Sequence, residues 1–292
     1  ELLEQVGVEG VELEELWTLE DEVLDGFEKL HGLIFLFEWK SGQDTSIGER
    51  IPLETIPADM FFARQVTTNA CATQALLSII LNTDGIHLGK TLTDFKGFTA
   101  SFPPDLKGEA IGASSELQQA HNSFSRKDAF LHEGKQIQST GAEDVFHFVA
   151  YIPHDGKVYE LDGLQTGPIV VGDIAEAGHK WYTIAREAIQ QRMNVASGGV
   201  KFNLMAVVGD KRAALKEKQG GLAEDSTEYV QIQSDLEQQE LKRKQWKLEN
   251  ERRRHNYVPL CVELIKQLAR QGKLPDLVTE AKGRMEAKRQ KK

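Results

Sequence analysis

The chain has 292 residues, of which 40% are hydrophobic and 27% are charged, a composition typical of globular proteins. Its formal net charge of −10 argues against binding nucleic acid, and no unbroken apolar run is longer than Leu33 to Phe37, so no membrane association is expected. The two cysteines, Cys71 and Cys261, form neither a metal-binding spacing nor a disulfide framework, and we expect no cofactor. Since no signal peptide opens the sequence, we expect a cytoplasmic and nuclear localisation.

Charge is distributed unevenly along the chain. Between Glu1 and Glu28 there are eleven acidic residues and no basic one, whereas residues 278–292 hold six basic and two acidic residues. The simplest interpretation is that both ends form solvated helical faces. The alternative is that the acidic end meets a basic partner and the basic end meets an acidic one.

The first elements are predicted from the spacing of apolar residues. Residues 1–30 carry apolar residues at roughly helical spacing and are predicted to be helical. The continuous apolar and aromatic run from Gly32 to Trp39 predicts a strand buried on both faces, near the centre of a sheet.

A buried helix is predicted to follow Asn69, which is a good N-cap residue, and to end near a glycine at position 85. Cys71 lies in its first turn, where unpaired N–H groups and the helix dipole favour a thiolate. Gln65 on the entering loop is placed to direct its amide N–H groups to the same point and to hold an oxyanion. A lone cysteine on an apolar helix is more often an inert core residue, so Cys71 also needs a base and an orienting group.

The base and the orienting group are predicted to lie on a β-hairpin. Strands over 145–152 and 157–163 flank the turn sequence of residues 153–156. A four-residue loop places His147 opposite Asp162, and a two-residue loop makes them diagonal neighbours on one face, whereas a three-residue loop separates them. Because a buried imidazole needs a polar partner, Asp162 is the candidate to fix the tautomer of His147. A His–Asp pair that is merely part of the core remains the alternative.

The remaining pattern predicts an α+β fold, with helices flanking a central, mostly antiparallel sheet. Helices are predicted over 92–102, 114–130 and 180–193, and further strands over 167–172 and 202–208. The composition changes after residue 210. We therefore expect one domain over 1–210, a linker over 211–226 and an all-helical extension with a basic tail over 227–292.

Several segments together resemble a known family. Gln65, Asn69–Gln74, Phe146–Val149 and Tyr159–Gly163 follow one another as the catalytic segments do in the ubiquitin C-terminal hydrolases, the UCH peptidases. The C-terminal extension, with its Arg254–Pro259 junction and Lys-rich tail, is similar to that of the proteasome-associated branch of the family.

The resemblance implies the UCH fold with a papain-like catalytic arrangement. It implies these roles: Cys71 as nucleophile, His147 as general base and acid, Asp162 as the residue that orients His147, and Gln65 as an oxyanion donor. It also implies that the loop over 132–143, with His132, Gly134 and Gly141, crosses the active site and limits which leaving groups pass. The implied partners are ubiquitin, a proteasomal ubiquitin-receptor subunit bound through the C-terminal helices, and a chromatin-remodelling subunit bound by the same region.

The expected reaction is thiol-dependent hydrolysis of an ester, peptide or isopeptide bond after the C-terminal glycine of ubiquitin. One alternative is a catalytically silent ubiquitin-binding scaffold that acts through its C-terminal helices. Another is a different acyl-transfer cysteine enzyme, such as a transglutaminase-like one. A reactive probe that carries the ubiquitin tail distinguishes the three.

Overall fold

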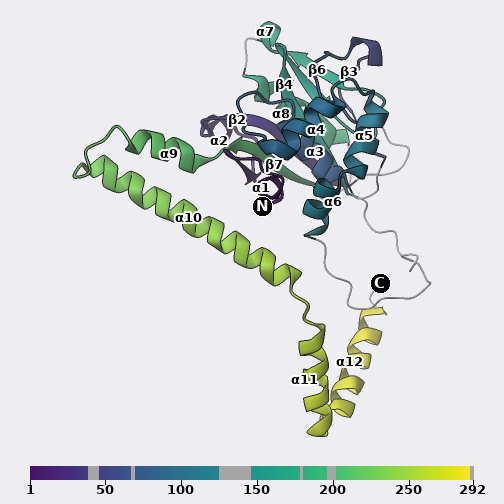
Figure 1. The fold of residues 1–292 in the computed structure, drawn as a ribbon. Helices are drawn as coiled ribbons and strands as arrows, with labels where there is room; N and C mark the ends of the chain where they lie inside the picture. Colours follow the sequence, from purple (N-terminus) through teal and green to yellow (C-terminus); the bar gives the residue numbers. More distant parts are fainter. Residues whose placement is uncertain (39–45, 67–69, 125–145, 178–179, 196–201, 290–292) are drawn as a thin grey trace. The chain divides into compact units, whose positions relative to one another are not determined.

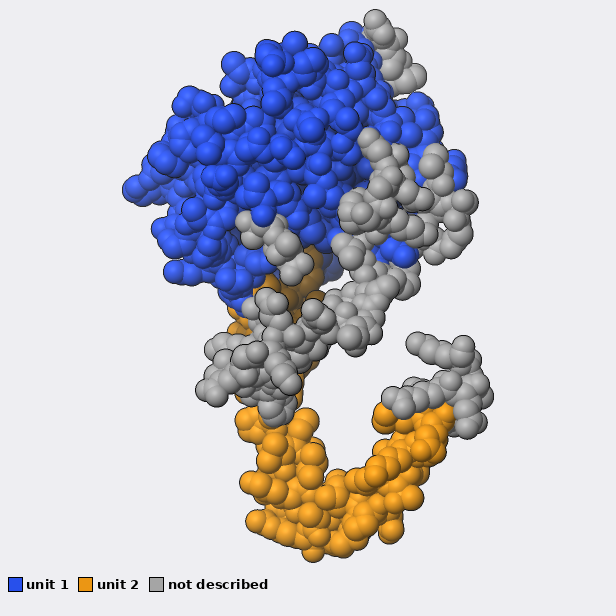
Figure 2. Space-filling view, turned by 90° about the vertical axis from the view of Figure 1, so that its right-hand side faces the viewer, with its two compact units in different colours: residues 1–123, 138–244 blue, residues 124–137, 245–292 orange. Residues whose placement is uncertain are grey.

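The computed structural model describes residues 1–38, 46–66, 70–124, 146–177, 180–195 and 202–289 (Figure 1). The chain divides into two compact units, coloured separately in Figure 2: residues 1–123 with 138–244, and residues 124–137 with 245–292. Among the described residues, no helix is both long enough and apolar enough to span a membrane.

The first unit is built on one sheet, which within the described residues has seven strands in the order β1-β7-β2-β4-β5-β6-β3. The strands are β1 (Val11–Leu16), β2 (Leu30–Glu38), β3 (Glu49–Arg50), β4 (Phe146–His154), β5 (Lys157–Leu161), β6 (Ile169–Asp173) and β7 (Phe202–Gly209). Every pairing between them is antiparallel. The apolar strand β2 lies inside the sheet, between β7 and β4, as its sequence predicts.

The described helices precede, interrupt and follow the strands. They are α1 (Leu2–Gln5), α2 (Asp21–Asp25), the 3-10 helix η1 (Leu53–Thr55), α3 (Cys71–Ile80), α4 (Gly89–Thr99), α5 (Pro104–Ala113), α6 (Ser115–Asn122), α7 (Ile174–Ala177), α8 (Trp181–Val195), α9 (Lys211–Gln219), α10 (Thr227–Arg254), α11 (Val258–Arg270) and α12 (Leu274–Arg289). The predicted α+β fold, an open antiparallel sheet flanked by helices, is confirmed.

The sheet separates two hydrophobic cores because successive strand residues point to opposite faces. Ile34 and Ala150 belong to the core formed with helices α3 to α6, which gather over one face of the sheet (Figure 1). Their neighbours Leu33 and Val149 belong to the core on the α8 side. Helix α3 packs against β4 and β2, so the sheet's central strands support the helix that Cys71 opens.

The prediction of a helical segment over residues 1–30 is wrong for its middle part. Residues 11–16 form the edge strand β1, which pairs with β7 from Val11↔Gly209 to Leu16↔Leu204. Glu12 is buried in this strand with a carboxylate oxygen 3.9 Å from Arg243. An inward-pointing glutamate interrupts the alternation of apolar and polar residues that indicates a strand. Its ion-pair partner lies more than two hundred residues away, so nothing nearby in the sequence indicates the pairing.

The region beyond residue 210 is more structured than expected. The expected linker over 211–226 begins with helix α9, and residues 227–244 of α10 belong to the first compact unit. Ile232 and Leu236 are buried there, and Lys242 lies 2.6 Å from Glu14. The second unit holds the rest of α10 and the helices α11 and α12, which contact each other.

Candidate active site

Cys71 is the first residue of the ten-residue helix α3 and is partly buried. The N-cap position is Ala70, one residue after the predicted Asn69, which lies outside the described residues. The side chain of Ala70 cannot cap the helix. Cys71 therefore stands at the N-terminal end of α3, where the first-turn N–H groups have no acceptor within the helix.

His147 and Asp162 lie together at the ends of strands β4 and β5. The pairing of His154 with Lys157 leaves Asp155 and Gly156 as a two-residue loop, with φ angles of 45° and 74° as a type I′ turn requires. His147 and Asp162 are thus diagonal neighbours, in one of the two registers that bring them together. Nε2 of His147 lies 2.6 Å from Oδ1 of Asp162, and the two residues are only 4% and 3% exposed.

The imidazole of His147 is held in its charged form. Burial lowers the pKa of His147, but hydrogen bonds with Asp162 and Cys71, and the charges of both, outweigh burial and raise the pKa to about 9. The hydrogen bond with Cys71 places the thiol beside the ring, and the bond to Asp162 occupies Nε2. An imidazolium beside a thiol at a helix N-terminus is the arrangement that activates cysteine nucleophiles.

Two polar side chains hold the loop that leads to Gln65. One is Gln74 of helix α3, and the other is Asn82, just beyond the C-terminal end of that helix. Asn82 accepts a hydrogen bond from the N–H of Phe61 at 2.6 Å and donates one to its carbonyl oxygen at 2.7 Å. The buried side chain of Gln74 donates to the carbonyl oxygen of Ala63. Neither role was predicted, although a buried glutamine in a mostly apolar helix indicates that its amide needs a hydrogen-bond partner.

The same loop is also held by the start of α5 and by the turn after β5. The N–H of Arg64 donates to the carbonyl oxygen of Pro104 at 2.9 Å, and a Cβ atom on Gly108 would lie 1.8 Å from the Arg64 carbonyl oxygen. The N–H of Gln65 donates to Gly163, the residue after Asp162, at 2.8 Å. These bonds bring Gln65 to the site of the other three predicted residues. The loop contacts therefore fix the backbone of Gln65 beside the predicted site.

The other predicted site residues cannot be placed. His132, Gly134 and Gly141, which were expected to belong to a loop that crosses the site, lie outside the described residues.

A buried polar group behind His147 was missing from the sequence-based prediction. Nη1 of Arg192 in α8 lies 2.8 Å from Oε1 of Glu160, and the hydroxyl of Tyr151 donates a hydrogen bond to Oε2 of the same carboxylate at 2.6 Å. The guanidinium lies 4.5 Å from the ring centroid of Phe37, and that ring packs edge-on against His147. Burial raises the pKa of Glu160, whereas Arg192 opposes the rise. The arginine therefore contacts the ring of Phe37, which packs on His147, and its charge also acts on Asp162.

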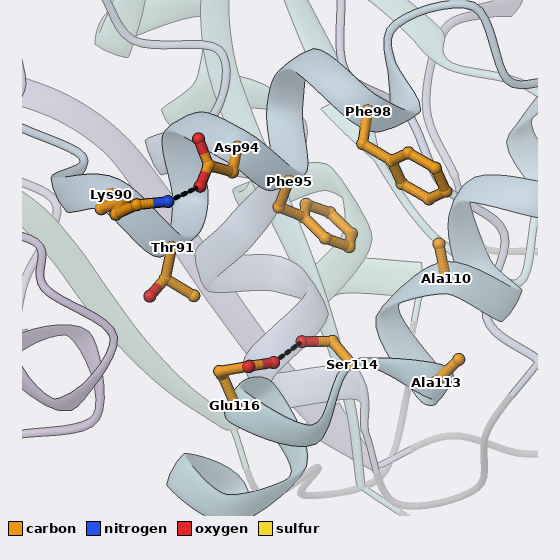
Figure 3. Close-up of a pocket in the computed structure, with 9 residues that line it drawn as sticks. All are labelled: Lys90, Thr91, Asp94, Phe95, Phe98, Ala110, Ala113, Ser114 and Glu116. Atoms are coloured by element: carbon orange, nitrogen blue, oxygen red, sulfur yellow. Dashed lines mark hydrogen bonds and ion pairs between the residues drawn. The ribbon is translucent and has the colours of Figure 1, made fainter.

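A cavity of about 470 Å³ lies between α4, α5 and the start of α6 (Figure 3). Phe95, Phe98 and two alanines line it, and Lys90 pairs with Asp94 at its rim. Two hydroxyl side chains, Thr91 and Ser114, also line it, and Ser114 caps α6 by accepting a hydrogen bond from the N–H of Leu117. The cavity thus lacks the nucleophile–base pair that the Cys71 site contains.

Part of the acidic N-terminal charge is neutralised within the chain. Asp21 pairs with Arg186, Asp25 pairs with Lys180, and Glu14 pairs with Lys242. The excess of eleven acidic residues therefore overstates the negative charge that this region presents to a partner.

Two family profiles match the chain. The profile described as ubiquitin carboxyl-terminal hydrolase, family 1, matches residues 1–194, and a second profile, described as ubiquitin carboxyl-terminal hydrolases, matches residues 230–274. The first match covers the whole of the Cys71 site, and the second covers most of α10 and all of α11.

Similar proteins match most of the chain, and one of them matches nearly all of it. Ubiquitin carboxyl-terminal hydrolase isozyme L5 of Dictyostelium discoideum is 37% identical, over 99% of this chain and 94% of its own. Ubiquitin carboxyl-terminal hydrolase BAP1 of Xenopus tropicalis is 40% identical, over 74% of this chain and 33% of its own. A crystal structure of Trichinella spiralis UCH37 bound to ubiquitin vinyl methyl ester matches with a TM-score of 0.69 and 32% identity, over 84% of this chain and 94% of that one.

Proposed function

The chain belongs to the ubiquitin carboxyl-terminal hydrolases of family 1 and is a thiol-dependent deubiquitinase, and we propose that Cys71 is its nucleophile. The observation that carries this proposal is the continuous series of contacts from the thiol through the ring of His147 to the carboxylate of Asp162. A metal or cofactor is not required, because a nucleophile, a proton carrier and an orienting anion suffice for acyl transfer.

The proposed reaction has two stages. The thiolate of Cys71 adds to the carbonyl carbon of the C-terminal glycine of ubiquitin, and His147 donates its proton to the amine as the bond after that glycine breaks, which leaves a thioester. His147 then removes a proton from water, the hydroxide displaces the thiol, and the thiol regains its proton through the same ring. Asp162 keeps Nε2 occupied throughout and stabilises the imidazolium.

Gln65 is proposed to hold the oxyanion of each tetrahedral intermediate, together with the backbone N–H of Cys71. Four residues between positions 61 and 65 form hydrogen bonds with neighbouring elements. These bonds support the role, because they hold Gln65 before the substrate binds. Replacing Gln65 with alanine is expected to lower kcat by about 10²–10³. The matched control is Gln267→Ala, an exposed glutamine on α11, which is expected to leave kcat unchanged.

The assignment of the nucleophile is tested with the two cysteines of the chain. Cys71→Ala should abolish hydrolysis of a ubiquitin C-terminal amide while preserving ubiquitin binding, and Cys261→Ser should leave the rate unchanged because Cys261 is exposed on α11. Full activity of Cys71→Ala would contradict the proposal. If the unmodified chain neither hydrolysed the amide nor reacted with a probe that carries the ubiquitin tail, but still bound its partner, a scaffold would be favoured instead.

We further propose that the C-terminal helices dock on a proteasomal ubiquitin-receptor subunit. Four apolar side chains of helix α11 are each between 43% and 55% exposed, and together they form a large apolar surface: Leu260, Val262, Leu264 and Ile265. Such a stripe at helical spacing is suited to a hydrophobic groove on a partner. A chromatin-remodelling subunit is proposed as a second partner for the same surface, and the two are expected to compete.

Docking is tested by placing a charge on the apolar stripe. Leu264→Asp should abolish binding of the receptor's docking domain, whereas Gln267→Asp, a polar exposed position on the same helix, should not. Both variants should hydrolyse a small ubiquitin C-terminal amide at the rate of the unmodified chain. Equal binding by both variants would exclude the stripe as the docking surface.

Regulation by docking is part of the same proposal. Folded substrates and ubiquitin chains are expected to be cut faster when the receptor's docking domain is bound, which is measured as turnover with and without that domain. Unchanged rates on every substrate would contradict it.

A cytoplasmic and nuclear localisation is also proposed, which the two free thiols of Cys71 and Cys261 support because free cysteines suit a reducing compartment.

A further inference from the structure

His154, the last residue of β4, has a buried ring nitrogen that the described residues leave without a hydrogen-bond partner. Its side chain is 10% exposed, and Nε2 itself is enclosed. Oδ1 of Asp59 lies 3.4 Å from this nitrogen and Oδ2 of Asp155 lies 3.8 Å from it. The three atoms all lie within 4.8 Å of one another, so one imidazole and two carboxylates converge on a single point.

A hydrogen bond does not account for this arrangement. Neither carboxylate accepts one from Nε2 among the described residues, although both are close enough for an ion pair. The ring cannot easily turn toward another partner, because it packs edge-on against the buried ring of Tyr159 at 6.2 Å between centroids. A buried nitrogen without a partner is costly, so a ligand that satisfies it has a stabilising effect.

We propose that His154, Asp59 and Asp155 bind one zinc ion. Zinc bonds to imidazole nitrogen and carboxylate oxygen at about 2.0–2.2 Å, and two ligands of a tetrahedral centre with such bonds lie about 3.4 Å apart. The nitrogen of His154 and the oxygen of Asp59 have that separation, and Asp155 is a few tenths of an ångström farther away. Both carboxylates are largely exposed, so they adjust by side-chain rotation, and water takes the fourth position.

The ligand types favour zinc over the abundant hard cations. Mg²⁺ and Ca²⁺ prefer an all-oxygen set of six or more ligands, whereas an imidazole in a small site suits Zn²⁺. The ion would connect two segments that serve the catalytic site. Asp59 lies six residues before Gln65, and His154 ends the strand that carries His147. Its role is therefore structural: it fastens the loop of Gln65 to the tip of the β4–β5 hairpin.

The test measures zinc binding by isothermal titration calorimetry and thermal unfolding of the full-length chain. The background is the double variant Cys71→Ala/Cys261→Ser, because free thiols and the Cys71–His147 pair are themselves potential zinc ligands. His154→Asn and Asp59→Asn are introduced separately into it. Asp59 is 73% exposed, so its variant folds normally even where the buried His154 variant does not. The matched control is His87→Asn, which removes an exposed histidine that lies 3.7 Å from Glu9.

We expect one zinc ion per chain in the background variant and in His87→Asn, with Tm raised by roughly 5 °C at a hundredfold excess over Kd. His154→Asn and Asp59→Asn should each weaken zinc binding at least tenfold and remove the rise in Tm, and Mg²⁺ or Ca²⁺ should produce neither effect. Zinc binding of equal affinity in Asp59→Asn, or no stoichiometric binding by the background variant, would overturn the proposal.

Discussion

His147 and Asp162 are in hydrogen-bond contact, 2.6 Å between Nε2 and Oδ1, although neither residue is the other's partner across the β4–β5 ladder. Asp162 lies one residue beyond the end of β5, and its Oδ1 also accepts a hydrogen bond from the N–H of Leu164 at 2.9 Å. The carboxylate is thus fixed by its own turn. It approaches the ring along a diagonal that a two-residue loop creates.

This contact predicts the alkaline limit of activity. Since the pKa of His147 is raised to about 9, the imidazolium that protonates the leaving amine is lost above that pH, and kcat/KM for a ubiquitin C-terminal amide should fall there. Asp162→Asn removes the charge and should move the alkaline limb to lower pH. The same raised pKa contributes stability that is fully present below pH 6.5 and is lost as pH rises through about 9. An alkaline limb of kcat/KM at the same pH in the unmodified chain and in Asp162→Asn would contradict the assignment of this limb to His147.

Gly163→Ala should impair catalysis more than folding. A Cβ atom there would overlap Nε2 of Gln74, which holds the Gln65 loop through Ala63, and would lie 3.1 Å from Cβ of Gln65, so both side chains must move. We expect kcat to fall at least tenfold with a smaller change in KM. Gly97→Ala is the control, because that Cβ would meet nothing within 4 Å and alanine stabilises a helix by about 0.5–1 kcal/mol.

Arg192→Met should destabilise the chain strongly. The substitution leaves Glu160 buried without its cation, which costs about 3–5 kcal/mol of unfolding free energy, measured by urea denaturation. The double variant Glu160→Gln/Arg192→Met removes both charges and should recover part of that loss. If the double variant lost more unfolding free energy than the two single variants lost together, the penalty would not come from an unpaired charge.

Arg243→Ala should loosen the first part of α10. Arg243 lies 2.9 Å from Asp210 and 3.9 Å from Glu12, both of which are almost fully buried, and it also pairs with Glu4. Removing it should cost about 3 kcal/mol in urea denaturation. Arg253→Ala on the same helix is the control, because its pair with Glu249 is exposed and is worth about 0.3–0.5 kcal/mol. Equal costs for the two would contradict the role of Arg243.

The sequence predicts well what depends on local pattern. Strand periodicity places His147 and Asp162 on one face for two of the three loop lengths considered, and the two-residue turn of Asp155 and Gly156 is one of these two. The strand β1 could not be predicted in this way, since Glu12 faces inward and its ion-pair partner Arg243 lies far away in the sequence. The supporting contacts of Gln74 and Arg192 depend on packing between elements far apart in the chain, and their residue types alone do not specify a partner.

The most direct test of the catalytic site is the covalent reaction with a ubiquitin whose C-terminus carries an electrophile, followed by peptide mapping by mass spectrometry. We expect one adduct per chain, located on Cys71, absent from Cys71→Ala and formed at an unchanged rate in Cys261→Ser. An adduct on Cys261, or an adduct that persists in Cys71→Ala, would contradict the assignment of Cys71 as the nucleophile.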